Sequence, residues 1–298
     1  MTPTILWDAD VRRLADMRRA IGRVSELLIG HSITPPRHRV DFGQNAELVF
    51  TIGGNKDVGG ARAYFSRYAK HHDDQAVIVW DMVSGAMKGA VFGFELGVLR
   101  MGAIGGVTID ALAPDDCTSL ALVGTGRQAC SHLEAAMTVR EIRSVSVFGR
   151  DEGRRLAFAD AIRNKYGVDA RATATAQAAV EGAEIVVLAT NSLRPVVEAE
   201  WLAGCRLVHS VGFKSPVGKE MGLDVPRGAA AIVTDSRSQL DEFGAKFILH
   251  GTDLFDAVAS LGDFVAGRRP RPDGLVVSYP LGVAGSDVVV ADELLSRA

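Results

Sequence analysis

A glycine-rich turn is the clearest chemical signal in the sequence. The apolar segment 118–123 runs directly into Gly124-Thr125-Gly126-Arg127-Gln128-Ala129, where a helical pattern begins. In a G-x-G-x-x-A turn the first glycine permits a tight bend and the second admits a pyrophosphate close to the backbone. The small third residue lets the helix pack on the strand. Because the first amides of the helix point at the phosphates, the turn predicts dinucleotide binding by Gly124, Thr125, Gly126, Arg127 and Gln128.

The end of the next predicted strand indicates which dinucleotide is bound. NAD-dependent folds place an acidic residue there, about 20 residues past the glycine turn, where it holds the ribose 2′-hydroxyl. This sequence has Gly149 and Arg150, with Arg154 and Arg155 one turn further on. Arginines can pair bidentately with a 2′-phosphate, so NADP is favoured over NAD. Two other interpretations stay open: Asp151 could act as the acidic residue, and the later arginines could form a solvated helix face.

The second half of the chain alternates strands and helices. Segments such as Ile185-Val186-Val187-Leu188 are apolar throughout, as in parallel strands covered on both faces. This alternation predicts an α/β fold whose larger domain, residues 114–274, is a doubly wound parallel sheet. The expected strands are 118–123, 144–148, 183–189, 206–211 and 230–234, and the expected helices are 126–139 and 151–165.

The first part of the chain has a different pattern. Helical spacing after a cap at Asp8 predicts a helix over 9–30, and short apolar segments then predict an antiparallel sheet. A second helix over 96–112 ends at Pro114, where we place a domain boundary. A strand at 275–278 and a helix at 282–297 are expected to return to this smaller α+β domain, residues 1–113 plus 275–298. Its expected strands are 40–42, 48–52, 61–68, 76–80 and 89–94.

Composition excludes several classes of protein. Lys plus Arg number 33 against 36 Asp plus Glu, and the net charge of −3 offers no field that would gather nucleic acid or an anionic membrane. The three cysteines form no C-x-x-C pair, which fits reduced thiols. The longest uncharged run, 274–286, is short of the roughly 18 residues that a membrane span needs. With acidic residues before any apolar run, a soluble, cytoplasmic protein is expected.

Several segments together resemble one family. They are Leu99-Arg100-Met101-Gly102-Ala103, the turn from Gly124 to His132, Ser210-Val211-Gly212 with Pro216 and Glu220, and Leu281 to Asp287. In this order, from about residue 35 to the end, they resemble the ornithine cyclodeaminase/mu-crystallin family. The resemblance implies a Rossmann-type NAD(P)-binding domain and a substrate-binding domain that forms a homodimer. It also implies hydride transfer at the C–N bond of a small α-imino or α-amino acid.

The resemblance carries roles to individual arginines. Arg100 falls on the arginine of the family's R-T-A-A segment, which holds the substrate carboxylate. Arg62 matches the family's catalytic lysine, and an arginine there can grip a carboxylate but cannot readily release a proton. Arg37 is the expected third substrate-binding arginine, with Arg39 as its competitor. Thr190, Val211, Gly212 and Gly149 complete the predicted cofactor site.

Lys214 stands where cyclodeaminases have an aspartate that engages the substrate's side-chain amine. A cation there would repel the distal ammonium of ornithine. Cyclodeamination with bound NAD therefore ranks below imine reduction or amino-acid dehydrogenation. The proton that the reduction needs would come from Lys214, from water, or from a preprotonated iminium. A third reading, motivated by Arg62, Met101 and Lys214, is a catalytically silent protein that binds NADP and a small molecule.

Other possible chemistry in the sequence has weaker support. His71-His72-Asp73-Asp74 has metal-binding atoms but lies in a polar connection, so a solvated turn is expected and no metal. His132 and His209 are expected to be hydrogen-bonded core residues. No G-x-S-x-G, P-loop or kinase signature is present, so acyl and phosphoryl transfer have no support.

Overall fold

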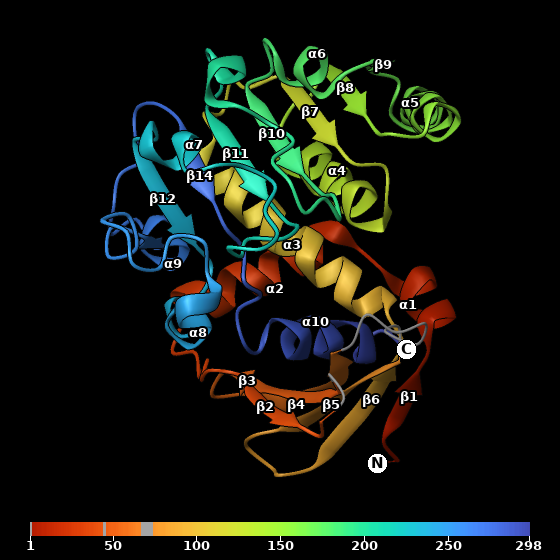
Figure 1. The fold of residues 1–298 in the computed structure, drawn as a ribbon. Coiled ribbons are helices and arrows are strands. Elements are labelled where there is room, and N and C mark those ends of the chain that lie inside the picture. Colours follow the sequence, from red (N-terminus) through yellow and green to blue (C-terminus); the bar gives the residue numbers. More distant parts are fainter. Residues whose placement is uncertain (1, 44–45, 67–73) are drawn as a thin grey trace. The chain divides into compact units, whose positions relative to one another are not determined.

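The computed structural model describes residues 2–43, 46–66 and 74–298, and its contacts divide the chain into two units (Figure 1). The first unit comprises Met1–Ile104, Ser236–Glu242 and Leu281–Ala298. The second comprises Gly105–Asp235 and Phe243–Pro280. Each unit contains one sheet, and the predicted mixed α/β class is confirmed.

The first unit contains a six-stranded sheet in the order β1-β6-β5-β4-β3-β2. Neighbours from β2 to β6 are antiparallel, as predicted, whereas β1 pairs with β6 in parallel and was not predicted. The strands are β1 (Thr4–Leu6), β2 (His38–Asp41), β3 (Glu47–Gly54), β4 (Val58–Ser66), β5 (Gln75–Asp81) and β6 (Met87–Phe92).

Two stacked helices lie over one face of this sheet. Helix α10 (Ser286–Leu295) packs on β3 to β6, and α2 (Met17–Ile29) packs on α10, as Figure 1 shows. The helix predicted over 9–30 is in fact two, α1 (Asp8–Leu14) and α2. The break occurs because the Asp16 carboxylate accepts a hydrogen bond from the Arg19 amide (3.1 Å) and so starts a new helix.

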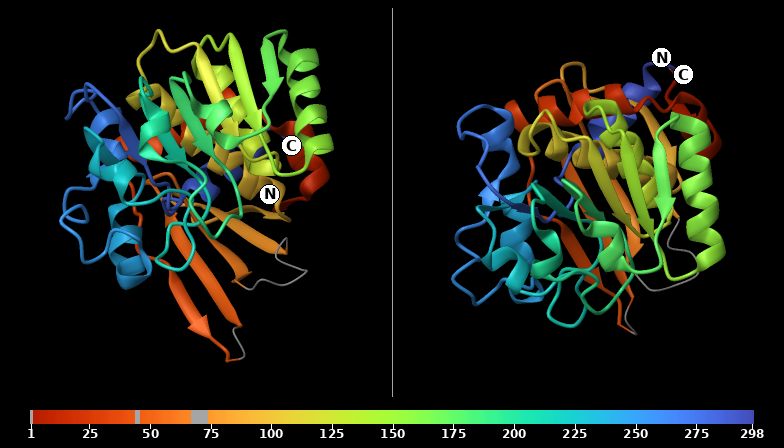
Figure 2. Two further views of the ribbon diagram at one scale, coloured as in Figure 1. Left: turned by 45° about the horizontal axis from the view of Figure 1, so that its top comes forward. Right: turned by 90° about the horizontal axis from the view of Figure 1, so that it is seen from above.

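The second unit contains an eight-stranded, wholly parallel sheet in the order β13-β12-β14-β11-β10-β7-β8-β9 (Figure 2). Helices α4 (Arg127–Val139), α5 (Glu152–Tyr166) and α6 (Ala176–Val180) pack on its strands, as expected of a doubly wound domain. Its strands are β7 (Ser119–Val123), β8 (Ser144–Phe148), β9 (Asp169–Ala172), β10 (Ile185–Leu188), β11 (Leu207–Ser210), β12 (Ala231–Thr234), β13 (Ala259–Ser260) and β14 (Val276–Ser278).

The remaining elements connect these strands. Helix α3 (Glu95–Leu112) begins in the first unit and ends in the second. The other helices are α4 (Arg127–Val139), α5 (Glu152–Tyr166), α6 (Ala176–Val180), α7 (Asp224–Arg227), α8 (Arg237–Phe243) and α9 (Leu261–Val265), with 3-10 turns at Ala199–Leu202 and Gly244–Lys246.

The structure differs from the expected arrangement at β14. The strand at 275–278 was expected to join the first domain, but β14 lies between β11 and β12 in the second sheet. Val276 and Val277 are fully buried. An apolar strand of this kind needs a central position with both faces covered, and the parallel sheet provides one. The division between the units also falls within α3, at Ile104 and Gly105, instead of at Pro114.

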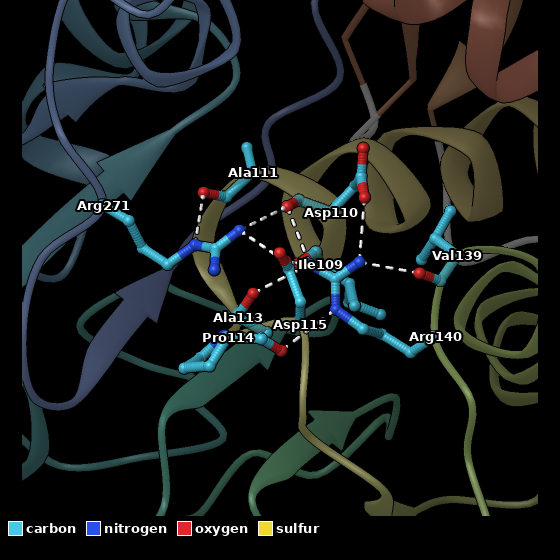
Figure 3. Close-up of polar contacts among 9 residues, drawn as sticks. All are labelled: Ile109, Asp110, Ala111, Ala113, Pro114, Asp115, Val139, Arg140 and Arg271. Carbon is cyan, nitrogen blue, oxygen red and sulfur yellow. Dashed lines mark hydrogen bonds and ion pairs between the residues drawn. The ribbon is translucent and has the colours of Figure 1, made fainter.

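Two arginines close the end of α3 in the second unit (Figure 3). The Arg140 guanidinium, whose side chain is 4% exposed, donates to five backbone carbonyls, those of Ile109, Asp110, Ala113, Pro114 and Val139. Arg271 donates to the carbonyls of Asp110 and Ala111 and pairs with Asp115. Two of these acceptors, the carbonyls of Asp110 and Ala111, belong to the last turn of α3, which leaves them without intrahelical partners.

Candidate functional site

The glycine turn lies between β7 and α4, as predicted. Gly124 has φ +120°, and a Cβ there would lie 2.2 Å from the Ala189 carbonyl oxygen, so only glycine fits. Gly126 is the N-cap of α4, and no side chain in the described part of the chain caps this helix. A Cβ built on Gly126 would meet nothing within 4 Å. The turn thus has free space beside a helix N-terminus, which suits a pyrophosphate.

Residues on both sides of the turn support this geometry. Ala129 is fully buried where α4 packs on β7. The Gln128 Oε1 is buried without a hydrogen-bond partner among the described residues. An orphaned acceptor next to the turn is available to a ligand that carries hydrogen-bond donors, such as a ribose hydroxyl.

The end of β8 lies against the glycine turn. A Cβ at Gly149 would lie 2.9 Å from the Thr125 Cγ2, so the absence of a side chain lets the two segments approach. Asp151 is the N-cap of α5, and its carboxylate accepts from the Arg154 amide (2.8 Å). The Asp151 carboxylate, which was the alternative to Arg150 as the group that contacts the ribose of the dinucleotide, is therefore already engaged as a helix cap.

The arginines after β8 differ in their surroundings. Arg155 is mostly buried, donates to the Gly149 carbonyl (3.3 Å) and pairs with Glu152 (3.5 Å). Arg150 and Arg154 are exposed and form no ion pair within the described residues. Both guanidinium groups are therefore available to an anion beside the end of β8.

A buried carboxylate joins the ends of β10 and β11. Glu220, 0% exposed, accepts hydrogen bonds from the Thr190 amide (2.7 Å) and hydroxyl (2.8 Å), the Ser210 hydroxyl (2.8 Å) and the Gly212 amide (2.7 Å). Burial raises the pKa of Glu220, and the four donors oppose that shift. Glu220 is one of the residues that carry the family resemblance, but its role was not predicted, because no spacing rule relates position 220 to position 190.

Lys214 lies in the loop after β11 and is half-buried. Its ammonium donates to the carbonyls of Val211 (3.2 Å) and Gly212 (2.8 Å). The side chain thus folds back over the end of its own strand, beside the predicted cofactor residues. Its predicted role as an acid stays a prediction.

In the first unit, two predicted arginines meet at one carboxylate. Arg62 on β4 pairs with Asp287 Oδ2 (Nη1, 3.4 Å), and Arg100 on α3 pairs with Asp287 Oδ1 (Nε, 3.1 Å). Both arginines are buried. Burial lowers the pKa of Arg100 to about 10, with Arg62 and Arg37 adding to the shift and Asp287 opposing it. Asp287, in the first turn of α10, was not predicted as a site residue, although an acidic residue between apolar residues was a possible signal.

Two further contacts fix the orientation of Arg62. Its Nε donates to the Gln75 Oε1 on β5 (3.0 Å), and its guanidinium lies 4.4 Å from the centre of the Tyr64 ring. An arginine held on three sides presents its charge in one place.

The structure distinguishes the two candidates for the third arginine. Arg37 donates to the carbonyls of Leu281 and Gly282. A Cβ at Gly282 would lie 2.4 Å from Arg100 Nη1 and 3.0 Å from Arg37 Nη2, so this glycine admits both guanidinium groups. Arg37 therefore joins the cluster with Arg62 and Arg100.

Arg39 has a different environment. It pairs with Glu47 (3.1 Å) and with Glu242 (3.4 Å). Its charge is thereby balanced by two carboxylates.

The cluster of Arg37, Arg62, Arg100 and Asp287 carries excess positive charge. Asp287 is the one carboxylate that pairs with these guanidinium groups in the described part of the chain. Three cations against one anion leave two positive charges in a largely buried place. Buried charge is costly unless it is paired, so this cluster is suited to an anionic ligand such as a carboxylate.

The two histidines lie in the core of the second unit. His132 Nδ1 donates to the Gln128 carbonyl (2.7 Å), His209 Nδ1 lies 3.1 Å from the Ser278 hydroxyl, and the ring centroids are 5.2 Å apart. Burial lowers the pKa of His132 to about 4 and that of His209 well below its ordinary value, with the Lys214 charge adding to both shifts. Both rings are therefore neutral near pH 7.

These shifts predict a dependence of stability on pH. Because the unfolded chain binds a proton near pH 6.5 and folded His132 only near pH 4, acid favours the unfolded state between these values. We expect the free energy of unfolding to fall by about 1.4 kcal/mol per pH unit for each such histidine. Urea titrations between pH 7.5 and 4.5 should show a shallower slope for His132→Gln. Equal slopes in the two proteins would contradict this account.

The described residues hold no group of three or more metal-ligating side chains. Of the turn predicted at residues 71–74, residues 71–73 lie outside the described residues. Cys117 and Cys205 are buried free thiols and Cys130 is an exposed one. Among the described helices, none has the length and apolar character that a membrane span requires.

Comparison with known proteins adds to this geometry. A model of the ornithine cyclodeaminase/mu-crystallin family matches residues 56–298. The Delta(1)-pyrroline-2-carboxylate reductase of Bacillus thuringiensis subsp. konkukian is 31% identical over 306 residues, which cover 96% of this chain and 94% of that protein.

Two solved structures share the fold. Thermococcus litoralis Delta(1)-pyrroline-2-carboxylate reductase, in complex with NADH and L-proline, has a TM-score of 0.84 at 21% identity, over 99% of this chain and 97% of that one. An archaeal alanine dehydrogenase dimer with bound NAD has a TM-score of 0.88 at 22% identity, over 100% of this chain and 96% of that one.

Proposed function

The chain belongs to the ornithine cyclodeaminase/mu-crystallin family, and on this premise we propose that it reduces the C=N bond of small α-imino acids with NAD(P)H. The observation that carries the proposal is the buried cluster of Arg37, Arg62, Arg100 and Asp287, whose excess positive charge suits a carboxylate. The glycine turn of the second unit supports the dinucleotide. A relative that reduces an imino acid supports the substrate class.

Reduction adds a hydride to the imine carbon and a proton to its nitrogen, and a bound reduced dinucleotide supplies the hydride. Arg100 and Arg37 bind the substrate carboxylate, because both guanidinium groups lie against Gly282. Asp287 and Gln75 hold Arg62 in a fixed orientation beside them. Fixing the carboxylate limits where the imine carbon can lie, which lowers the entropic cost of reaching the transition state.

Lys214 is the proposed proton donor to the nitrogen. Arg62 stands in the place of the family's lysine, and an arginine does not readily release a proton. A substrate that arrives as a protonated iminium would need no donor from the protein. Lys214→Met separates these cases, since turnover unchanged by the substitution would remove Lys214 from the mechanism.

NADP is the proposed cofactor. Arg150 and Arg154 are exposed beside the end of β8, and the Asp151 carboxylate is engaged as the cap of α5. An arginine pair without a competing carboxylate favours a 2′-phosphate over a 2′-hydroxyl.

This preference predicts the effect of one substitution. Arg150→Ala should weaken NADPH binding about tenfold, the loss of one charge-assisted hydrogen bond, and change NADH binding less than about twofold. Fluorescence titration of the protein with each nucleotide measures both values. Arg143→Ala, which removes an arginine that is 70% exposed and paired with Glu141, is the control. Equal weakening of NADPH and NADH would contradict the assignment.

A homodimer is proposed from the outer face of the first sheet. The residues in register, Ile5, Ala90, Ile78, Ala61 and Ile52, form one apolar row across five strands. Ile5 is 58% and Ile52 50% exposed, on the face opposite α10. A broad apolar face of this kind marks an interface. The archaeal alanine dehydrogenase that shares this fold is a dimer.

We expect Ile78→Asp to convert the dimer to a monomer, because a carboxylate in the middle of the row would be buried without a partner. Light scattering after size exclusion measures the mass, and circular dichroism checks the fold. Val83→Asp, in the exposed β5–β6 turn, should leave the mass unchanged. A wild-type protein that is monomeric at micromolar concentration would refute the proposal.

Oxidation of NADPH and NADH by the purified protein tests the function. The panel contains α-keto acids with ammonia or methylamine and preformed cyclic ketimines. Oxidation that depends on one of these substrates is the expected result. Ammonia release from ornithine without net oxidation would indicate a cyclodeaminase instead, and tight dinucleotide binding without turnover would indicate a binding protein.

A further inference from the structure

Glu220 stands out because nothing in the hydride-transfer chemistry requires a carboxylate at its position. It is 0% exposed, and each of its oxygens accepts two hydrogen bonds. Oε1 accepts from the amide and hydroxyl of Thr190, and Oε2 accepts from the Ser210 hydroxyl and the Gly212 amide. A buried carboxylate is tolerated only when it is saturated with donors in this way.

The four donors come from two different strand ends. Thr190 follows β10, whereas Ser210 ends β11 and Gly212 follows it. The backbone of Glu220 adds two links, since its carbonyl accepts from the Val196 amide (2.8 Å) and its amide donates to the Phe213 carbonyl (3.2 Å). One residue therefore ties the loop after β10 to the loop after β11.

The two loops also touch directly. A Cβ on Gly212 would lie 2.4 Å from the Thr190 carbonyl oxygen and 2.5 Å from the Glu220 carboxyl carbon. The backbone of one loop thus packs on that of the other with no room for a side chain. Glu220 holds this close approach in place by bonding to both sides of it.

The loops after β10 and β11 lie at the edge of the sheet where a ligand is expected to bind. From β7 the chain proceeds to β8 and β9 on one side and then returns to β10 and β11 on the other. This reversal beside β7 is the switch point at which open α/β sheets bind ligands. The glycine turn follows β7, so a dinucleotide whose pyrophosphate lies there extends its two halves toward opposite sides of the reversal. Because the residue that contacts the adenosine ribose follows β8 in such folds, the nicotinamide half of a bound dinucleotide would lie toward the loops after β10 and β11.

We infer that Glu220 is a positioning residue for the nicotinamide half of the cofactor. It acts through Thr190 and Gly212, whose backbones it fixes, and does not itself touch the dinucleotide. The inference rests on the proposed function, because it requires that the second unit binds a nicotinamide dinucleotide. We infer in addition that different residues hold the two halves of the cofactor site in place, and that only the nicotinamide half depends on Glu220.

The test compares a whole cofactor with its adenosine fragment. Calorimetry measures binding of the preferred reduced dinucleotide and of its fragment, 2′,5′-ADP for NADPH or AMP for NADH, to the wild-type protein and to Glu220→Gln. A glutamine amide keeps one acceptor oxygen and faces the remaining donors with an NH2 group. We expect the dinucleotide to bind about tenfold more weakly and the fragment to change less than about twofold. Glu198→Gln, an exposed carboxylate in the loop after β10, should change neither.

The outcomes are distinct. Equal weakening of dinucleotide and fragment would show a general structural role and overturn the inference, as would no change in either. If Glu220→Gln does not fold, Ser210→Ala carries the test, because it removes one of the four donors and should weaken the dinucleotide selectively by about threefold. Retention of full dinucleotide affinity in Ser210→Ala would then overturn the inference. A wild-type protein that binds neither dinucleotide would instead contradict the proposed function, and the inference with it.

Discussion

Replacing Arg100 with alanine is expected to lower kcat/KM for imine reduction by about a thousandfold and to leave dinucleotide binding unchanged. Arg100 is buried and lies against Gly282 together with Arg37. Removing it takes away a desolvated cation that the substrate carboxylate needs in both the bound and transition states. Steady-state kinetics with the most active imine of the panel, together with nucleotide titration, measures the two effects.

The fold should survive this substitution because Asp287 keeps its pairing with Arg62. Arg13→Ala is the matched control, since that side chain is 62% exposed and pairs only with Asp10 among the described residues. We expect its kcat/KM to stay within about twofold of wild type. A loss of less than about tenfold in Arg100→Ala would mean that the carboxylate is bound elsewhere.

Replacing Arg140 with methionine is expected to lower the free energy of unfolding by about 3 kcal/mol. The guanidinium bonds to four carbonyls at the end of α3 or just after it and to the Val139 carbonyl at the end of α4, and it pairs with Asp110 (Figure 3). Methionine fills similar space without any donor. The buried carbonyl of Ala113 would lose the hydrogen bond that Arg140 donates, whereas the Ile109 carbonyl would keep the bond from the Ala113 amide (3.0 Å). Urea unfolding followed by circular dichroism measures the change.

Arg143→Met provides the comparison, because its side chain is 70% exposed and bonds to Glu141, itself 78% exposed. Its expected effect is within about 0.5 kcal/mol. If Arg140→Met unfolds at the same urea concentration as Arg143→Met, the end of α3 does not depend on this network. Normal nucleotide affinity in folded Arg140→Met would show that the network acts on stability alone.

Local patterns in the sequence determined much of the fold. The uniformly apolar segment at Ile185–Leu188 and the glycine turn at Gly124 specify a parallel sheet and its connection to α4, because strand burial and positive φ are properties of a few adjacent residues. The helix at Glu95–Leu112 follows from a pattern of the same short range. Such features can be predicted without knowing which distant residues they contact.

Short elements, and the position of each strand within a sheet, could not be predicted as well from the sequence. Thr4–Leu6 has only three residues and becomes a strand because β6 offers it an edge. Similarly, Val276–Ser278 could have joined either sheet on its own pattern. It joins the second sheet, between β11 and β12, because both faces of the strand are buried in that position. The pairing therefore depends on the neighbouring strands and not on the residues of the strand alone.

The candidate site divides in the same way. The residue types at Arg62, Arg100 and Gly124 were informative in the sequence, since chemistry and spacing are local. The tertiary structure alone selected Arg37 over Arg39, brought Asp287 between two arginines, and gave Glu220 its four donors. These outcomes depend on which charges are buried away from water and on the partners that they pair with, and those partners lie up to 245 residues apart in the chain.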